Sequence, residues 1–86
     1  MKIRLSFDDR YYLGRRLYVA RANIRMSQGE VSEVVGIRRA TVSEIENGKV
    51  NITLRVLIDL CLLYHVDPMY YVHSLYVRAR KRKEEK

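Results

Sequence analysis

Apolar side chains recur every three or four positions along most of the chain, which is the spacing of one face of an α-helix. The first series predicts a helix from about Phe7 to Ala22. Ser6 precedes this helix and Asp9 follows three positions later, so a serine cap and an acidic first turn mark its start. The apolar series itself consists of Leu13, Leu17, Ala20 and Ile24.

Two short helices are predicted next. Ser27 and Glu30 have the spacing of a capping box, and Gly36 ends this second helix after about eight residues. A third helix is expected from near Arg38 to near Asn47. The apolar residues expected to face inward are Val31, Val34 and Val35 in the second helix and Val42 and Ile45 in the third.

The last third of the chain predicts two more helices. Thr53 is a suitable cap for the fourth, and Asp67 with Pro68 forms a good start for the fifth. The buried face of the fourth helix is expected to contain Leu54, Leu57, Ile58, Cys61 and Leu62. The fifth helix carries Met69, Tyr70, Tyr71, Val72, Leu75 and Tyr76.

These elements predict an all-α fold, a compact bundle of about five helices with an extended C-terminal helix. We divide the chain into an N-terminal arm at residues 1–6, one domain at 7–77 and a basic tail at 78–86. The alternating pattern of the arm also suits a short strand, but we favour a frayed end. For the tail we favour a solvated, frayed helix end, and the alternative is a phosphate-binding arm.

Composition restricts the partners and the chemistry. With 86 residues and a formal net charge of +7, the chain favours a polyanionic partner, nucleic acid first and an anionic membrane surface second. Neither a leader nor an apolar run of ~18 residues is visible, so we expect a cytoplasmic location and no membrane span. The single cysteine, Cys61, excludes an internal disulfide and a cysteine-cluster metal site. Without a nucleophile–base arrangement or a phosphate-binding glycine loop, we expect no cofactor, no metal and no enzymatic activity.

The segment from Ser27 to Asn51 carries a motif. Its sequence, SQGEVSEVVGIRRATVSEIENGKVN, resembles the phage-repressor or Xre-type (Cro/cI-like) helix-turn-helix DNA-binding family in about a dozen positions. The matching residues are Ser27, Gln28, Glu30, Val31, Ser32, Gly36, Ile37, Thr41, Val42, Ser43, Ile45, Glu46, Gly48 and Lys49. The resemblance covers about residues 17–72 and implies a lambda-repressor-like fold, with the helix-turn-helix proper at about 27–47. The sequence departs from the family pattern at three positions. Arg38 stands where a capping serine or threonine is usual, Ser32 replaces a usual alanine, and His65 replaces a common glycine. His65 is therefore expected in a left-handed conformation.

The resemblance implies that the third helix lies in the major groove of DNA, with its N-terminal end facing base edges. The base-facing positions are then Arg38, Arg39, Ala40 and Glu44. Arg39 is expected to contact guanine, whereas Arg38 suits either guanine or a phosphate. Ala40 suits a thymine methyl group. Glu44 either accepts a hydrogen bond from cytosine, or pairs with Arg39 or faces water.

Other family positions imply phosphate contacts and one structural pair. The phosphate-contacting residues are expected to be Gln28, Thr41, Ser43, Asn47 and Lys49. In this family, an arginine before the second helix pairs with the glutamate of the third. Arg21 and Glu46 occupy these two positions, so we expect an ion pair that fixes the recognition helix.

The fifth helix holds more apolar surface than one small domain needs. We therefore expect a homodimer whose interface contains Tyr70, Tyr71, Leu75 and Tyr76. The sequence predicts a sequence-specific regulator of transcription that binds double-stranded DNA, with repression as the expected outcome. One alternative is an antitoxin or other protein-interaction module that binds an unidentified protein partner through this helix. A second is an RNA-binding or general nucleic-acid-coating protein.

Overall fold

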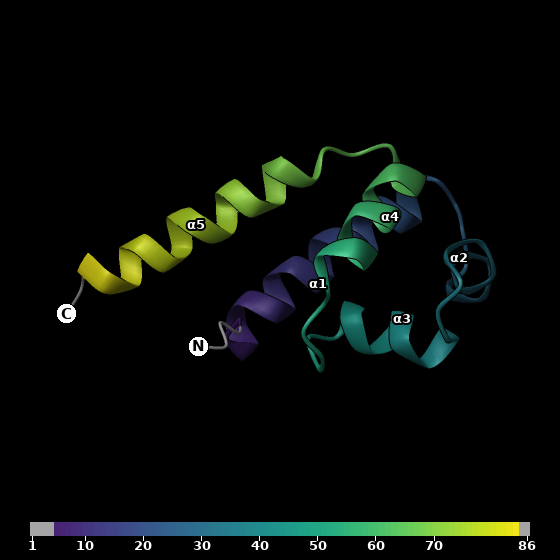
Figure 1. Cartoon of the computed structure of the whole chain (residues 1–86), viewed down its shortest axis with the longest axis horizontal. Coiled ribbons are helices and arrows are strands. Elements are labelled where there is room, and N and C mark those ends of the chain that lie inside the picture. Colours follow the sequence, from purple (N-terminus) through teal and green to yellow (C-terminus); the bar gives the residue numbers. More distant parts are fainter. Residues whose placement is uncertain (1–4, 85–86) are drawn as a thin grey trace.

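The computed structural model describes residues 5–84, which form five α-helices and no strand. The helices are α1 (Phe7–Asn23), α2 (Gln28–Val35), α3 (Arg39–Glu46), α4 (Leu54–Tyr64) and α5 (Pro68–Glu84) (Figure 1). The predicted all-α fold with an extended C-terminal helix is confirmed. Of the possible short strand over residues 1–6, residues 1–4 lie outside the described part of the chain, and Leu5 and Ser6 form no strand.

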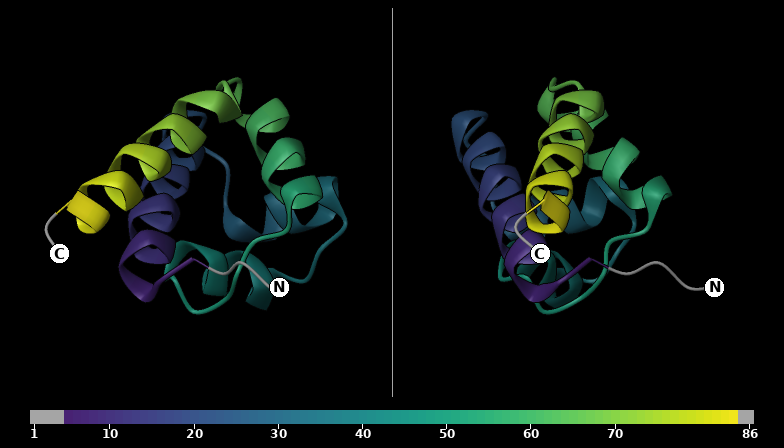
Figure 2. Two further views of the ribbon diagram at one scale, coloured as in Figure 1. Left: turned by 60° about the vertical axis from the view of Figure 1, so that its left-hand side comes forward. Right: turned by 90° about the vertical axis from the view of Figure 1, so that its left-hand side faces the viewer.

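α1 is the helix around which the others are assembled. It contacts α3, α4 and α5, while α2 packs against α3 and α4. α5 turns back after α4 and runs beside α1, so that its C-terminal end lies near the start of α1 (Figures 1 and 2). None of the helices in residues 5–84 is long and apolar enough to cross a membrane.

The helix ends predicted from capping residues form as expected. The hydroxyl oxygens of Ser6 and Thr53 accept hydrogen bonds from the main chain of α1 and α4. Ser27 and Glu30 make both hydrogen bonds of a capping box, at 3.0 and 2.9 Å. His65 ends α4 in the left-handed conformation, with φ at 59°, where a glycine would carry no Cβ penalty. Local sequence rules therefore determine where these helices begin and end.

All five helices contribute side chains to the core. Its buried apolar residues are Leu13, Leu17, Ala20, Val31, Val42, Ile45, Leu57, Leu60, Cys61, Tyr64 and Tyr71. Cys61 is a core residue, and its burial raises the pKa of the thiol to about 11, so the thiol is uncharged at neutral pH.

The predicted inward face of α4 is partly wrong. Leu57 and Cys61 are buried, but Leu54 and Leu62 are 67% and 71% exposed, and Ile58 is also exposed. α4 is apolar on two sides, and the stripe that packs inward is Leu57, Leu60, Cys61 and Tyr64. Val34 of α2 was likewise expected inside and is exposed, because Val31 and Val35 face the core. The spacing of apolar residues could not decide which stripe would be covered.

The residues expected at a dimer interface are divided by the fold. Tyr70 and Tyr76 are exposed on α5, and Leu75 is half-buried against the core. Tyr71 is only 5% exposed and belongs to the core of the protomer, so the prediction that it lies at an interface is wrong. The cause is the close approach of α5 to α1 and α4, which covers this side of α5.

The basic segment after residue 77 is helical as far as Glu84 rather than frayed. Two of its arginines hold it against the start of α1. Arg78 Nε donates to Asp9 Oδ1 at 2.9 Å, and Arg82 Nη2 donates to Asp9 Oδ2 at 2.7 Å. The Asp9 side chain is only 3% exposed, and these two guanidinium groups neutralise its buried charge. Residues 85–86 of the predicted tail lie outside the described part.

Candidate nucleic-acid interface

α2 and α3 are joined by a turn whose shape is fixed by local contacts. Gly36 has a left-handed φ of 80°, which glycine adopts without steric cost. The Ser32 hydroxyl then donates to the carbonyl oxygen of Ile37 on the far side of the turn. The serine that replaces the usual alanine of the family therefore contributes a hydrogen bond inside the turn. Together α2, this turn and α3 form a helix-turn-helix unit.

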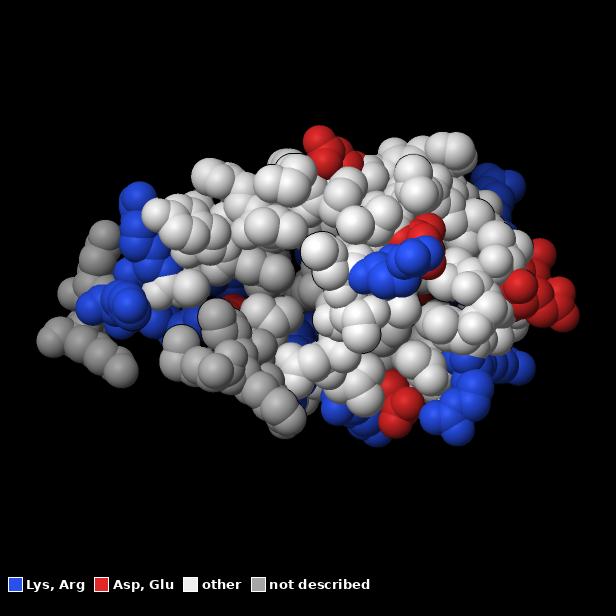
Figure 3. Space-filling view, viewed as in Figure 1, with Lys and Arg blue, Asp and Glu red and all other residues white. Residues whose placement is uncertain are grey.

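The four residues predicted to contact bases lie on the outer side of α3. Arg38, Arg39 and Ala40 are exposed, Glu44 is half-exposed, and Val42 and Ile45 face the core on the opposite side. Arg38 occupies the N-cap position without a side-chain capping bond. In the space-filling view, basic side chains gather over the N-terminal end of α3, with acidic ones beside them over α2 (Figure 3).

Arg38 and Arg39 have no ion-pair partner among residues 5–84. In particular, neither arginine pairs with Glu44. The alternative in which Glu44 pairs with Arg39 is therefore not what the structure contains. Two guanidinium groups thus stand at a helix N-terminus, where the macrodipole already favours an anion. The arrangement presents uncompensated positive charge to a ligand.

The residues predicted to contact phosphate occupy both ends of the unit. Gln28 begins α2, but its amide nitrogen donates to Glu46 Oε1 at 2.9 Å, so part of its hydrogen-bonding capacity is used inside the protein. Asn47 and Lys49 are exposed after the end of α3, and Asn47 Nδ2 donates to the Ser43 carbonyl oxygen at 2.8 Å. The remaining two, Thr41 and Ser43, are half-buried along α3.

Arg21 and Glu46 form the expected ion pair, which ties α1 to α3. Arg21 Nε and Nη2 donate to the two carboxylate oxygens of Glu46 at 2.6 and 3.1 Å. Arg21 Nη1 also donates to the carbonyl oxygen of Met26, ahead of α2. The hydrogen bond to Glu46 raises the pKa of the Arg21 guanidinium above its usual value. With Gln28 also bound to Glu46, this network fixes α1, α2 and α3 relative to one another.

Two further arginines of α1 hold the C-terminal end of α3, and the sequence analysis missed both. Arg15 Nε and Nη2 donate to the main-chain oxygen of Glu46, while Arg10 Nε donates to that of Gly48 at 2.8 Å. The Arg15 guanidinium lies between the rings of Tyr11 and Tyr18, 5.5 and 4.8 Å from their centroids. Cations are favourable at a helix C-terminus. The alternation of arginine and tyrosine along one side of α1 was the available signal.

The contact between α1 and α3 depends on Gly14. A Cβ at this position would lie 2.3 Å from the carbonyl oxygen of Ile45 and 2.8 Å from that of Glu46. Only glycine allows the two backbones to approach this closely. The angle at which α3 is presented is therefore set by main-chain contact as well as by the arginines.

Within residues 5–84, no group of three or more His, Cys, Asp or Glu side chains is placed to hold a metal ion.

Solved structures share this arrangement. The restriction-modification controller protein C.AhdI from Aeromonas hydrophila has a TM-score of 0.70 and 25% identity, over 74% of this chain and 97% of its own. The clp gene regulator ClgR from Corynebacterium glutamicum has a TM-score of 0.71 and 20% identity, over 90% and 86% of the two chains. A hypothetical transcription factor, NHTF from Neisseria, has a TM-score of 0.68 and 24% identity, over 83% and 81%. No curated protein matches the chain.

The helix-turn-helix unit and its supporting helices define a nucleic-acid-binding class of fold. A profile of the helix-turn-helix family HTH_3 matches residues 17–71, which include α2, α3 and α4. The chain therefore belongs to this family, the Xre-type helix-turn-helix proteins, and is a DNA-binding transcription regulator.

Proposed function

We propose that the protein is a sequence-specific repressor that binds a roughly palindromic operator in double-stranded DNA as a homodimer. Repression would follow because protein bound at the operator blocks polymerase. We assign it no enzymatic activity and no cofactor.

The observation that carries the proposal is the exposed Arg38–Arg39 pair at the N-terminal end of α3. Both side chains are exposed and lack an ion-pair partner among the described residues. A guanidinium that donates two hydrogen bonds to guanine O6 and N7 is worth ~1–3 kcal/mol of discrimination. Arg39 supplies this contact, and Arg38 contacts either guanine or phosphate. Ala40 and Glu44 follow on the same face, against a thymine methyl group and a cytosine amino group.

Phosphate contacts from both ends of the unit fix the protein on the duplex. Asn47 and Lys49 lie after α3, and Gln28 lies at the start of α2, where free main-chain N–H groups favour an anion. Thr41 and Ser43 contribute from the side of α3. These contacts supply salt-dependent affinity without reading sequence.

Exposed apolar residues on α4 and α5 support a homodimer. Tyr70 and Tyr76 of α5 are exposed, and so are Leu54 and Leu62 of α4. Covering such residues with a second copy removes apolar area from water. A twofold axis would place two recognition helices about 34 Å apart, one turn of DNA.

Selection of bound sequences from a random pool of duplex DNA tests the proposal. We expect a motif with two related half-sites and at least ~10³-fold preference over unrelated DNA. Little preference among sequences would instead support a general nucleic-acid-coating protein. Light scattering after size exclusion tests the oligomer separately, and a monomer at tens of micromolar would exclude a preformed dimer while leaving dimerisation on DNA.

The exposed apolar residues of α5 also suit a second candidate function, an antitoxin or other module that binds a partner protein. Met69, Tyr70 and Tyr76 are all exposed there. Co-purification of the product of a neighbouring gene, in a complex that is lost when Tyr70 and Tyr76 are replaced by serine, would favour it over the homodimer.

A further inference from the structure

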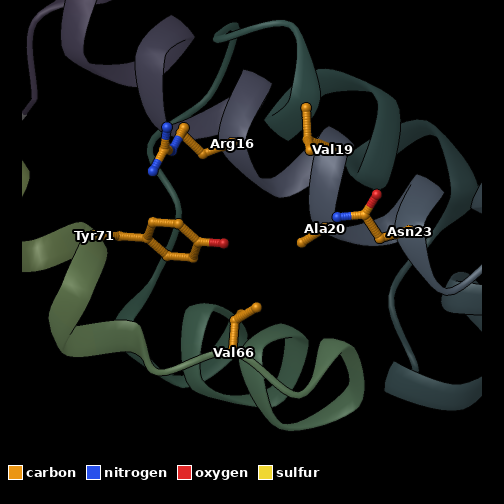
Figure 4. Close-up of a pocket in the computed structure, with 6 residues that line it drawn as sticks. All are labelled: Arg16, Val19, Ala20, Asn23, Val66 and Tyr71. Carbon is orange, nitrogen blue, oxygen red and sulfur yellow. The ribbon is translucent and has the colours of Figure 1, made fainter.

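A hollow of about 260 Å³ lies between α1 and the junction of α4 with α5. Its lining residues are Arg16, Val19, Ala20, Asn23, Val66 and Tyr71 (Figure 4). A second hollow of about 310 Å³ adjoins it and shares Arg16, Val66 and Tyr71. None of these residues belongs to the proposed DNA interface, so the hollow is a separate feature of the fold.

Tyr71 is nearly buried, yet its hydroxyl group has no hydrogen-bond partner among residues 5–84. The hydroxyl points into the hollow rather than into the core (Figure 4). Burial raises the pKa of Tyr71, so the group is a neutral hydroxyl that can donate a hydrogen bond. No side-chain oxygen or nitrogen of the described residues is both buried and unpaired, so this hydroxyl is open to solvent in the hollow. It is therefore free to donate to an acceptor that enters the hollow.

Arg16 stands beside Tyr71 and supplies the charge. Its guanidinium lies 5.8 Å from the ring centroid of Tyr12 and 5.4 Å from that of Tyr70, so the aromatic rings hold it in place. No carboxylate of the described residues pairs with it. Arg16 and Tyr71 occupy one end of the hollow and Asn23 the other (Figure 4). Three hydrogen-bond donors therefore line the hollow, and the positive charge lies at the end formed by Arg16 and Tyr71.

The rest of the lining is apolar, and the first hollow contains no acidic residue. Asp67 lines only the adjoining hollow, and its Oδ1 accepts a hydrogen bond from the main-chain N–H of Met69. Val19, Ala20 and Val66 provide small apolar walls. We propose that this hollow binds a carboxylate carried on a small, branched apolar group, with the carboxylate between Arg16 and Tyr71. The carboxylate belongs either to a free organic acid or to the C-terminus of a partner chain.

Titration of the isotope-labelled full-length protein with isovalerate, followed by amide NMR, tests the site. We expect saturable shifts at Ala20, Asn23 and Tyr71. The neutral analogue isovaleramide has the same shape and should produce at least tenfold weaker binding, because only the ionised ligand makes charge-assisted hydrogen bonds. Shifts that grow without saturation, or equal responses to acid and amide, would overturn the proposal.

Three variants assign the contacts. Arg16→Gln should weaken isovalerate binding by about tenfold, and Tyr71→Phe, which keeps the ring, by about threefold or more. Arg55→Gln removes an exposed arginine of α4 outside the hollow and should leave the affinity unchanged. An affinity that survives both Arg16→Gln and Tyr71→Phe would place the ligand elsewhere and refute the assignment. None of these readouts depends on DNA binding, so the outcome is independent of the proposed function.

A second titration distinguishes the two sources of carboxylate. The peptide acetyl-Gly-Gly-Leu ends in a free carboxylate on a branched apolar residue, as the end of a partner chain would. Binding at least tenfold tighter than isovalerate would identify a chain end as the natural ligand. Equal or weaker binding would identify a free acid, and failure of both probes to bind would overturn the proposal.

Discussion

Arg15 of α1 donates two hydrogen bonds to the main-chain oxygen of Glu46, at 3.1 and 2.6 Å, and so holds the last residue of the recognition helix. Lysine cannot reproduce this bidentate hydrogen bonding or the stacking of the guanidinium on tyrosine rings. We expect Arg15→Lys to lower the free energy of unfolding by about 1–2 kcal/mol in urea titrations. Arg55→Lys, on the exposed side of α4, is the control and should change it by less than about 0.5 kcal/mol.

Gly14 is the point where the backbones of α1 and α3 meet. Gly14→Ala places a methyl group against the carbonyl oxygens of Ile45 and Glu46, so the helices must separate. We expect a loss of about 2 kcal/mol or more in unfolding free energy, together with weaker operator binding. Gly29→Ala is the matched control, because a Cβ there meets nothing closer than 3.8 Å. It should be neutral or stabilising by up to about 1 kcal/mol, and equal losses in both variants would contradict the packing argument.

Glu46→Gln removes the negative charge of Glu46, which pairs with Arg21, and preserves the shape of the Glu46 side chain. Both side chains are largely buried, at 3% and 13% exposed, so an unpaired guanidinium would remain inside. We expect a loss of about 3 kcal/mol in thermal or urea unfolding. Glu44→Gln, on the outer side of the same helix, should leave stability almost unchanged and affect only DNA binding.

The Asp9 carboxylate makes stability depend on pH in the acidic range. Hydrogen bonds from Arg82 and then Arg78 hold its pKa below the usual value, although burial alone would raise it. A carboxylate of lowered pKa contributes its full stabilisation above the unfolded value of about 4 and loses it as the pH falls through the folded value. We therefore expect unfolding free energy to fall below about pH 4, and to fall less steeply in Asp9→Asn.

Asp8→Asn is the control for this pH dependence. Asp8 is exposed, lies in the same first turn of α1 and makes no ion pair with a described residue. Its variant should retain the acid dependence of the original protein. If Asp9→Asn keeps the same slope as Asp8→Asn, the buried pair does not govern acid stability.

Arg39 and Lys49 should separate base reading from phosphate binding. Arg39→Ala is expected to change the base selected at one position of each half-site from a random DNA pool. Lys49→Ala should weaken binding to all sequences alike and reduce the slope of log affinity against log salt by about 1. An unaltered motif in Arg39→Ala would show that the base assignment is wrong.

The sequence was sufficient for features that depend on neighbouring residues. Ser6, Ser27 and Thr53 cap their helices because a short hydroxyl side chain satisfies a main-chain N–H group within the same turn. The Arg21–Glu46 pair was predictable only through the family pattern, since 25 positions separate the two residues. The helix-turn-helix was predictable because the Ser27–Glu30 capping box and the Gly36 turn are local and match the family pattern.

Features that depend on which face is covered were not predictable. α4 carries apolar stripes on two sides, so periodicity could not show that Leu60 packs inward while Leu54 and Leu62 remain exposed. Tyr71 is buried because α5 folds back along α1, a path that its own spacing does not encode. The contacts of Arg10 and Arg15 with the end of α3 join helices that are distant in sequence, and they follow from the tertiary arrangement alone.

The pairing of Asp9 with Arg78 and Arg82 also has a consequence for how the protein opens. These ion pairs hold the first turn of α1 against the last turns of α5. Unfolding of either segment therefore removes the contact that holds the other. Amide exchange in both segments should then accelerate together and to the same extent in Asp9→Asn, which removes the ion pairs. The start of α1 and the end of α5 therefore open as one cooperative unit.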